Sequence, residues 1–286
     1  MVFCCRVSGG VLMSMPQVIV INDLSGFGRC SLSVQLPVLS VLQSEVLMLP
    51  TSLLSNHTAY PSFVSRDLAQ DINPWIDQWK TLPISPAALL TGFISSAQQA
   101  EGILHALDAY HSDACLYICD PAMADHGQLY SSLSVSIVVQ MKKLALRADL
   151  LLPNVTEACL LAGANWHEKW TVEQLDELVS LLEAKGFPSK MVITGIETTD
   201  GLLGDYVVDE TSRTPLFFSP VYPSRCGTGD LFSAVVCGAL LQNDTLIEAV
   251  KRAQQFIQAA LKVSCEDKTD PREGCEFEKV LPLLMK

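Results

Sequence analysis

Short apolar runs alternate with longer amphipathic segments along most of the chain. Each run is short enough to be a strand buried on both faces, and the segments between the runs repeat apolar residues at helical spacing. The runs that we interpret as strands are Gln17–Ile21, Glu45–Leu49, Ala88–Thr91, Cys115–Cys119, Leu150–Leu152 and Met191–Thr194. The segments that we interpret as helices include Ser96–Tyr110, Ser132–Leu146 and Thr171–Lys185. Repeated strand and helix predict an α/β fold, with a mostly parallel sheet covered by helices on both faces.

The last third of the chain adds a different pattern. Leu202–Val208 and Pro215–Ser219, joined by the polar turn Asp209–Thr214, predict an antiparallel hairpin at the sheet edge. Two helices, Leu231–Leu241 and Thr245–Val263, are expected to follow. The chain has 286 residues, 49% of them hydrophobic, and no low-complexity linker or internal repeat. We therefore expect one large α/β domain over residues 15–286.

The first residues do not fit this alternation. The opening MVFCCRVSGGVLMSM has only one cation, Arg6, and short apolar stretches, so it makes a poor signal peptide. We expect residues 1–14 to be a disordered leader or to lie upstream of a true start near Met13 or Met15.

Charge and cysteine content exclude several classes of protein. The formal charge is −12, from 19 basic and 31 acidic residues, and no run of Lys or Arg is present, so nucleic acid is not an expected partner. The sequence contains no segment of eighteen uninterrupted apolar residues, so a membrane span is not expected. The ten cysteines match neither a zinc site nor a secreted disulfide scaffold, so we expect a reducing, cytoplasmic compartment.

The string GTGD marks the start of the helix at Leu231–Leu241. Gly227 and Gly229 allow backbone N–H groups to converge where the helix dipole favours negative charge. An oxyanion or a transferring phosphoryl group would be stabilised there. Asp230 would lie in the first helical turn, where it could accept a proton from an attacking hydroxyl. A glycine-rich turn with an acidic helix start is the structural alternative.

Acids also follow two of the expected strands. Asp120 and Asp125, in the string CDPAMADHGQLY, suit a hydrated Mg²⁺ beside phosphates, although Asp-Pro and His-Gly are also ordinary turn formers. In LLPNVTEACLLAG, Asn154 and Glu157 have the spacing of a capping box. Glu157 could instead hold a metal-bound water.

Two polar segments remain in the first sixty residues. NDLSGFGRCSL, Asn22–Leu32, follows the first strand and opens a helix, but its glycine spacing does not fit a dinucleotide fingerprint. SNHTAY, Ser55–Tyr60, is a polar island in which a lone His57 would ordinarily be a structural hydrogen-bonding residue.

These five segments, in the order in which they occur along the chain, resemble the ribokinase-like superfamily and, within it, the pyridoxal/pyridoxamine (vitamin B6) kinases. The resemblance covers roughly Val18 to Val263. GTGD is shared across the superfamily. DPAMAD, PNVTEACLL and SNHTAY are similar to the DPVMGD, PNxxEAELL and SNHT strings of the B6 branch, and NDLSGFGRCSL looks like the form in bacterial proteins labelled pyridoxamine kinase.

The resemblance implies a three-layer α/β sandwich that binds ATP and substrate along one crest. It implies ATP-dependent phosphorylation of the 5′-hydroxymethyl group of pyridoxal, pyridoxamine or pyridoxine, with Mg²⁺ and a homodimer. K⁺ is a candidate monovalent cation, but the sequence does not give the cation preference. Asp230 matches the catalytic base, and Gly227, Thr228 and Gly229 match its anion hole. The positions that match the ATP site are Asp120, Tyr130, Asn154, Glu157 and Thr194, with Asp120, Asp125 and Glu157 around the metal. The positions that match the pyridine pocket are Asp23, His57, Thr58 and Phe93.

Two departures from the family pattern leave the preferred vitamer open. Asp23 stands where many members have Ser, and Phe93 stands where many have Tyr. A carboxylate at position 23 could accept a hydrogen bond from a protonated ring nitrogen or an amine, whereas Phe93 can stack on a ring but has no hydroxyl. Asp230 is kept where some relatives have Cys, and we expect the nearby Cys226 to be a buried bystander.

Three alternative functions remain. A hydroxymethylpyrimidine kinase would share the fold, the base and a flat aromatic substrate, but SNHTAY argues against it. A sugar kinase would need an Asp- and Asn-rich lid near the N-terminus, which is not evident. A non-catalytic carrier of the vitamin or of pyridoxal phosphate would not need the intact GTGD.

Overall fold

The computed structural model describes residues 15–285, and the expected leader at residues 1–14 lies outside them. Within the described residues, nine strands form one sheet in the order β11-β10-β9-β8-β5-β4-β1-β2-β3, and β6 and β7 form a small second sheet. The strands are β1 Gln17–Ser25, β2 Glu45–Leu54, β3 Ser65–Asp67, β4 Pro86–Thr91, β5 Leu116–Cys119, β6 Ala124–Asp125, β7 Gln128–Leu129, β8 Leu150–Leu151, β9 Met191–Glu197, β10 Leu203–Asp209 and β11 Ser212–Phe218. The helices are α1 Leu32–Val41, α2 Ala69–Trp79, α3 Ala97–Tyr110, α4 Ser136–Ala145, α5 Val155–Ala162, α6 Val172–Ala184, α7 Thr228–Leu241 and α8 Leu246–Glu266, followed by short 3-10 turns at Pro271–Glu273 and Leu281–Leu284.

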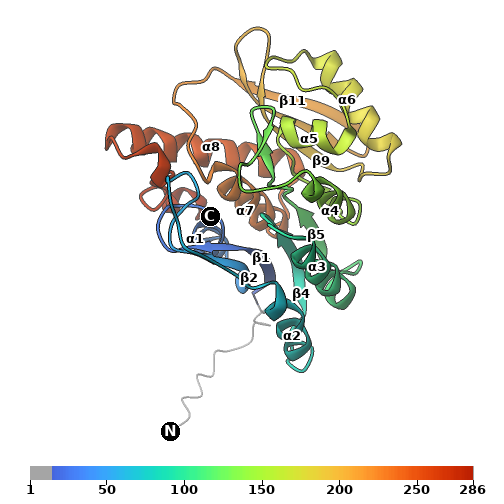
Figure 1. Cartoon of the computed structure of the whole chain (residues 1–286). Helices are drawn as coiled ribbons and strands as arrows, with labels where there is room; N and C mark the ends of the chain where they lie inside the picture. The colour runs from blue at the N-terminus through green and yellow to red at the C-terminus, as the bar shows by residue number, and fades with distance from the viewer. Residues whose placement is uncertain (1–14, 286) are drawn as a thin grey trace, which may run out of the picture.

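The predicted three-layer architecture is confirmed (Figure 1). The six neighbouring strands from β2 to β9 run parallel, while β3, β10 and β11 pair antiparallel at the two edges. Alternate residues of β1 point to opposite faces. Val18 and Val20 pack with α1, α7 and α8, whereas Ile19 and Ile21 pack with α2 to α6.

Some element boundaries differ from the predictions. The edge hairpin is present, but backbone pairing continues to Asp209 and Ser212, so the turn is shorter than expected. The fourth helix begins at Ser136 rather than Ser132, after a stretch of turns. The whole of α2 was missed, because Pro74 lies inside it and an internal proline ordinarily breaks a helix.

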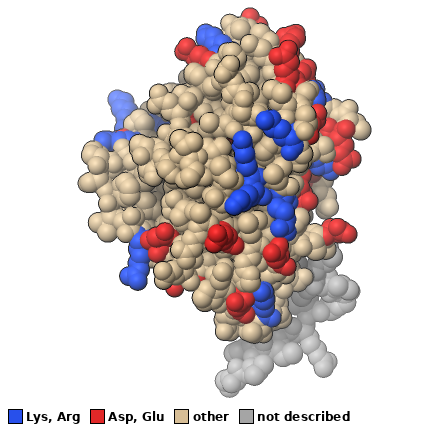
Figure 2. All heavy atoms as spheres, turned by 45° about the vertical axis from the view of Figure 1, so that its right-hand side comes forward, with Lys and Arg blue, Asp and Glu red and all other residues tan. Residues whose placement is uncertain are grey.

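One face of the molecule carries side chains of both charges. Figure 2 shows a small group of Lys and Arg side chains on one face, with Asp and Glu side chains nearby. That face has no broad basic surface of the kind that nucleic acids require. No helix within residues 15–285 is long and apolar enough to cross a membrane.

Candidate active site

The carboxyl ends of the parallel strands bring most of the predicted site residues to one crest. Asp23 lies near the end of β1, Phe93 follows β4, and Asp120 follows β5 directly. Asn154 follows β8 and pairs through a β-bridge with Thr194 in β9. Since ligands of open α/β sheets bind beyond the carboxyl ends of the strands, these side chains are in the expected place for a site.

The GTGD string begins α7 as predicted, and its two glycines have different surroundings. Gly227 is the N-cap with a φ of 77°, and a Cβ at this position would overlap the carbonyl oxygen of Arg29. Gly229 has open space where a Cβ would be. The cap makes no side-chain hydrogen bond to the helix, so the first backbone N–H groups keep their capacity for an anion.

Asp230 lies in the first turn of α7, in contact with neutral donors. Its Oδ1 accepts a hydrogen bond from Asn22 Nδ2 at 3.0 Å, and its carboxylate accepts one from the backbone N–H of Ser31. Burial and the nearby Asp23 raise the pKa of Asp230 to about 6, while the two donors lower it. A carboxylate with such a pKa is well suited to accept a proton near neutral pH.

Asp120 is a second acid with a raised pKa at this crest. Its side chain is buried, and burial together with the charge of Asp230 raises its pKa to about 8, against a lowering hydrogen bond from Ser233. Within residues 15–285, neither Asp120 nor Asp230 forms an ion pair with Lys, Arg or His. The crest therefore holds acids that a bound cation would stabilise in their ionised form.

Glu157 and Asn154 form the capping box that their spacing predicts. Asn154 Oδ1 accepts from the backbone N–H of Glu157 at 3.0 Å, and Glu157 Oε2 accepts from the backbone N–H of Asn154 at 2.8 Å. Glu157 Oε1 accepts from the N–H of Met123 at 2.9 Å. Burial and Asp120 raise the pKa of Glu157. Because both oxygens hold backbone donors, a metal role for Glu157 fits better through a bound water.

Tyr130 lies among the acids, whereas Asp125 lies at their margin. Tyr130 keeps 38% of its surface exposed, and partial desolvation together with the charges of Glu157 and Asp120 raises its pKa. Asp125 is exposed in the small β6–β7 hairpin, where its Oδ1 accepts from the N–H of His126 at 2.8 Å. Within the described part of the chain, no three His, Cys, Asp or Glu side chains are grouped to hold a metal by themselves. Mg²⁺ in kinases takes few protein carboxylates and completes its shell with water and phosphate, so the oxygen donors present are of the right kind.

The predicted substrate residues lie on the β1, β2 and β4 side of the crest. Asp23 is 6% exposed, and its carboxylate accepts from Ser31 Oγ at 2.6 Å and Ser25 Oγ at 3.3 Å. Burial raises its pKa. The partly buried Phe93 donates its backbone N–H to Asn22 Oδ1 at 3.0 Å. Asp23 thus already holds two hydroxyls of its own chain, and these contacts stabilise the segment that joins β1 to α1.

His57 and Thr58 are in a loop that closes against the segment after β1. The N–H of His57 donates to the carbonyl of Phe27 at 2.8 Å, and His57 Nδ1 accepts from the N–H of Ala59 at 3.1 Å. Burial lowers the pKa of His57. Thr58 is exposed, and the ring of Phe27 packs 5.7 Å from that of Tyr60. The structural reading of His57 therefore holds in part, because one ring nitrogen stabilises its own loop.

Several residues at the site were not predicted. Asn22 contacts Asp230, and a polar chain continues from Asn22 through Gln35 to Ser233. For Gln35 and Ser233 the sequence did contain a signal. Each is a buried polar residue in an otherwise apolar helix, Gln35 in LSVQLPVLSV and Ser233 in LFSAVVCG. Buried polar groups of this kind need partners, so they indicate a hydrogen-bond network.

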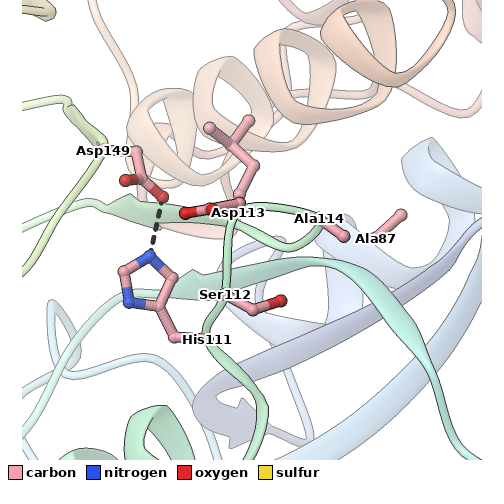
Figure 3. A pocket seen from close by; sticks show the side chains of 7 residues that line it. Ala87, His111, Ser112, Asp113, Ala114 and Asp149 are labelled. Carbon is pink, nitrogen blue, oxygen red and sulfur yellow. Dashed lines mark hydrogen bonds and ion pairs between the residues drawn. The ribbon is translucent and has the colours of Figure 1, made fainter.

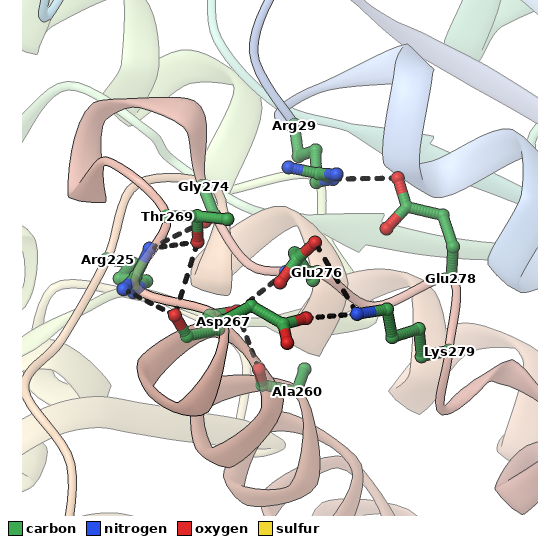
Figure 4. A network of polar contacts seen from close by, with 10 residues as sticks. Arg29, Arg225, Ala260, Asp267, Thr269, Gly274, Glu276, Glu278 and Lys279 are labelled. Carbon is green, nitrogen blue, oxygen red and sulfur yellow. Dashed lines mark hydrogen bonds and ion pairs between the residues drawn. The ribbon is translucent and has the colours of Figure 1, made fainter.

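The loop before α7 is anchored by the C-terminal segment (Figure 4), which was also not foreseen. Arg225 is buried and donates to Thr269 Oγ1 at 2.9 Å and to the carbonyl of Ser264 at 3.1 Å. Arg29 pairs with Glu278 at 2.7 Å. Cys226 is partly exposed, not buried as expected, because it lies in this loop and not within a helix or strand.

A cavity of about 620 Å³ lies at the other end of the sheet (Figure 3). It is lined by Ala87, His111, Ser112, Asp113, Ala114, Leu116 and Asp149, beside the amino ends of β4, β5 and β8. His111 Nε2 and Asp149 Oδ2 pair there at 2.9 Å. None of the predicted site residues lines this cavity, so the chemistry is expected at the crest.

Comparison with known proteins identifies the family of the chain. Fold and site place the chain among kinases of the ribokinase-like class. A model described as phosphomethylpyrimidine kinase matches residues 77–274, and the chain belongs to that family.

The chain is also similar over most of its length to pyridoxal kinases. It is 30% identical to pyridoxal kinase of Arabidopsis thaliana over 240 residues, which cover 80% of this chain and 76% of the relative. The structure of pyridoxal kinase from Lactobacillus plantarum superposes with a TM-score of 0.86 at 31% identity, covering 95% of this chain and 97% of the other. A Bacteroides thetaiotaomicron protein described as a phosphomethylpyrimidine kinase, crystallised with pyridoxal, superposes with a TM-score of 0.88 at 33% identity, covering 94% and 96%.

Proposed function

We propose that the protein transfers the γ-phosphoryl group of ATP to the 5′-hydroxymethyl group of pyridoxal, pyridoxamine or pyridoxine, and so takes part in vitamin B6 salvage. The observation that carries the proposal is Asp230, whose pKa is raised to about 6 at the uncapped start of α7, beside Asp23. A base and an anion site thus adjoin Asp23, one of the residues that we propose to contact the substrate ring. The similarity to pyridoxal kinases supports the choice of substrate.

The chemistry follows from the geometry of α7. The substrate hydroxyl loses its proton to the Asp230 carboxylate as its oxygen bonds to the γ-phosphorus, and the bond from that phosphorus to the ADP oxygen breaks. The N–H groups at Gly227, Thr228 and Gly229, at the start of α7 where no side chain caps the helix, would stabilise the charge that develops on the phosphoryl oxygens. Asp230 then carries the proton until product leaves.

The nucleotide side of the proposal involves the acids after β5 and β8. Asp120, Asp125 and Glu157 would hold Mg²⁺ directly or through water, and the ion would neutralise phosphate charge when bound. Tyr130, Asn154 and Thr194 would contact ATP. Ionisation of Asp120, whose pKa is raised to about 8, would be favoured by the cation.

The substrate side consists of four proposed residues. Phe93 would stack on the pyridine ring, while His57 and Thr58 would close the pocket from the loop after β2. Asp23 would accept a hydrogen bond from the ring nitrogen or from an amine substituent. These roles are proposals, supported by the proximity of Asp23 and Phe93, which share Asn22 as a hydrogen-bond partner.

Further properties belong to the same proposal. One kinase domain would span residues 15–286, act as a homodimer in the cytoplasm, and respond to K⁺ as a monovalent cation. The family resemblance supports the dimer, and the ten cysteines without a disulfide or zinc spacing support the reducing compartment.

The second candidate is hydroxymethylpyrimidine or its phosphate as substrate, because the family model bears that name. Steady-state phosphorylation of pyridoxal, pyridoxamine, pyridoxine and hydroxymethylpyrimidine, measured side by side, separates the two. The proposal requires a higher kcat/KM for at least one B6 vitamer than for the pyrimidine. Binding of vitamers with no ATP turnover would instead indicate a carrier.

A further inference from the structure

Asn22 lies fully buried where β1 passes the start of α7, and its side chain makes four hydrogen bonds. Its Nδ2 donates to Asp230 Oδ1 at 3.0 Å and to Gln35 Oε1 at 3.1 Å. Its Oδ1 accepts from the backbone N–H groups of Asp23 at 2.9 Å and Phe93 at 3.0 Å. Both donors and both acceptor positions of the amide are therefore used.

The orientation of this amide is fixed by its surroundings. A flipped amide would put Nδ2 against the two backbone N–H groups and leave Oδ1 facing the Asp230 carboxylate, so it would lose favourable contacts on both sides. Gly92 is packed against the same group, because a Cβ there would overlap the Asn22 amide. Asn22 thus presents a permanent N–H donor to Asp230.

The same network reaches the second acid of the crest. Gln35 Nε2 donates to Ser233 Oγ at 3.3 Å, and Ser233 is also a hydrogen-bond partner of the Asp120 carboxyl group. Ser233 Oγ lies 3.3 Å from the backbone oxygen of Asp230. Neutral side chains therefore connect Asp230 with Asp120 beneath the crest.

The other groups around Asp230 are acidic or weakly acidic. Asp23 of β1 raises its pKa, and Asp230 in turn raises the pKa values of Asp120, Cys30 and Tyr130. Within the described residues, no Lys or Arg forms an ion pair with Asp230. Its ionised form is stabilised by the Asn22 amide and by the backbone N–H of Ser31.

We propose that Asn22 is a positioning residue for phosphoryl transfer, which orients the Asp230 carboxylate and keeps it ionised so that it can take the substrate proton. The inference rests on the proposed function, because it needs Asp230 to act as a base. It goes beyond that function by assigning the control of the base to a buried amide and its partners Gln35 and Gly92.

The test is Asn22→Asp, with Asn22→Ser as a second variant. Asp keeps an acceptor for the two backbone N–H groups but places a second acid beside Asp230, so the acidic limb of the kcat/KM profile should move up by about one pH unit or more. Ser is too short to replace the donor. The acidic limb of the kcat/KM profile of Asn22→Ser should therefore move in the same direction, but by less than that of Asn22→Asp. The control is Asn73→Asp, which adds the same charge on the exposed side of α2 and should leave the limb unchanged.

A second readout does not depend on substrate. The carboxyl ¹³C shift of Asp230, assigned through Asp230→Asn, should titrate at higher pH in both Asn22 variants than in the unmodified protein. An equal loss of rate at every pH, with an unmoved Asp230 titration, would show that Asn22 only supports the fold. A raised Asp230 pKa in a protein that phosphorylates no vitamer would overturn the proposed function and leave the Asn22–Asp230 coupling in place.

Discussion

At the scale of single residues, the environment of Asp230 decides whether it can serve as a base. An ordinary exposed carboxylate has a pKa near 4 and binds a proton too weakly to be an efficient base at neutral pH. Burial and Asp23 raise the pKa of Asp230 to about 6, and the donors Asn22 and Ser31 prevent a larger rise. The group is therefore mostly ionised at pH 7 and still basic enough to take a proton.

Replacing this base gives the first prediction. Asp230→Asn should lower kcat by about 10²–10⁴, the range that general-base catalysis contributes, because the amide cannot accept the substrate proton. The affinity for ATP should change little. The matched control is Asp113→Asn, an exposed position at the opposite end of the sheet. A near-normal kcat in Asp230→Asn would remove this residue from the mechanism.

Asp23 gives a second prediction about vitamer preference. Pyridoxamine presents a charged amine and pyridoxal an aldehyde that only accepts, and charge-assisted hydrogen bonds are about twice as strong as neutral ones. If Asp23 faces the amine, Asp23→Ser should reduce kcat/KM for pyridoxamine much more than for pyridoxal. Equal losses would indicate a contact with the ring nitrogen. An unchanged ratio with lower stability would mean that Asp23 only holds Ser25 and Ser31.

At the scale of elements, the starts of two helices differ in a way that fits their roles. The start of α5 is closed by the Asn154–Glu157 capping box, whereas α7 starts at Gly227 with no side-chain cap. The capping box of α5 uses N–H groups at the start of that helix within the protein, whereas α7 keeps its first N–H groups for a ligand. The cap also connects α5 to the loop after β5, because Asn154 Nδ2 donates to the carbonyl of Ala124 at 2.7 Å.

The capping box leads to the third prediction. Glu157→Gln puts an NH₂ group among backbone N–H donors, so one of them loses its acceptor and the free energy of unfolding should fall by about 1–3 kcal/mol. If Glu157 also acts on the metal, the Mg²⁺ concentration for half-maximal rate should rise as well. Thermal denaturation and a Mg²⁺ titration of the rate measure the two effects. Lower stability with an unchanged Mg²⁺ dependence would leave only the cap.

Elements with a strong local signal could be predicted from the sequence, and contacts between distant segments could not. The alternation of strands and helices, the Asn154–Glu157 capping box and the glycine start of α7 are all local patterns, and all are present. The helix around Pro74 was missed because tertiary packing of Ile72 and Ile76 outweighs the proline signal. The Asn22–Asp230 bond joins residues 208 positions apart, so no local pattern could indicate it.

At the scale of the whole molecule, the acids divide into two groups with opposite effects on stability. Asp230, Asp205 and Asp120 have pKa values raised by burial to about 6, 7 and 8. Partly exposed Asp270, held by Arg272, has its pKa lowered to about 2. The first group binds more protons in the folded chain than in the unfolded chain between pH 4 and 8, and the second binds fewer below pH 4.

The last prediction follows from this division. An acid whose pKa is raised in the folded chain contributes its full stabilisation below the pKa of the unfolded chain, near 4. This stabilisation is lost as the pH rises through the pKa of the folded chain. The metal-free protein should therefore unfold at a lower temperature at pH 8 than at pH 5. Burial lowers the pKa of His57, so this single group acts against the trend. Below pH 4 the loss of salt-bridged carboxylates such as Asp270 should destabilise the chain again, which places the maximum near pH 5.

Thermal denaturation across pH 4 to 9, with and without Mg²⁺ and ATP, measures this behaviour. Asp120→Asn removes the acid with the highest of the three pKa values, so the slope between pH 5 and 8 should become shallower. Mg²⁺ with ATP should raise the melting temperature more at pH 8 than at pH 5, because a cation favours the ionised acids. A melting temperature that rises steadily from pH 5 to 8 in the metal-free protein would mean that these carboxyl groups are ionised in the fold, and that the crest does not depend on a cation to keep them so.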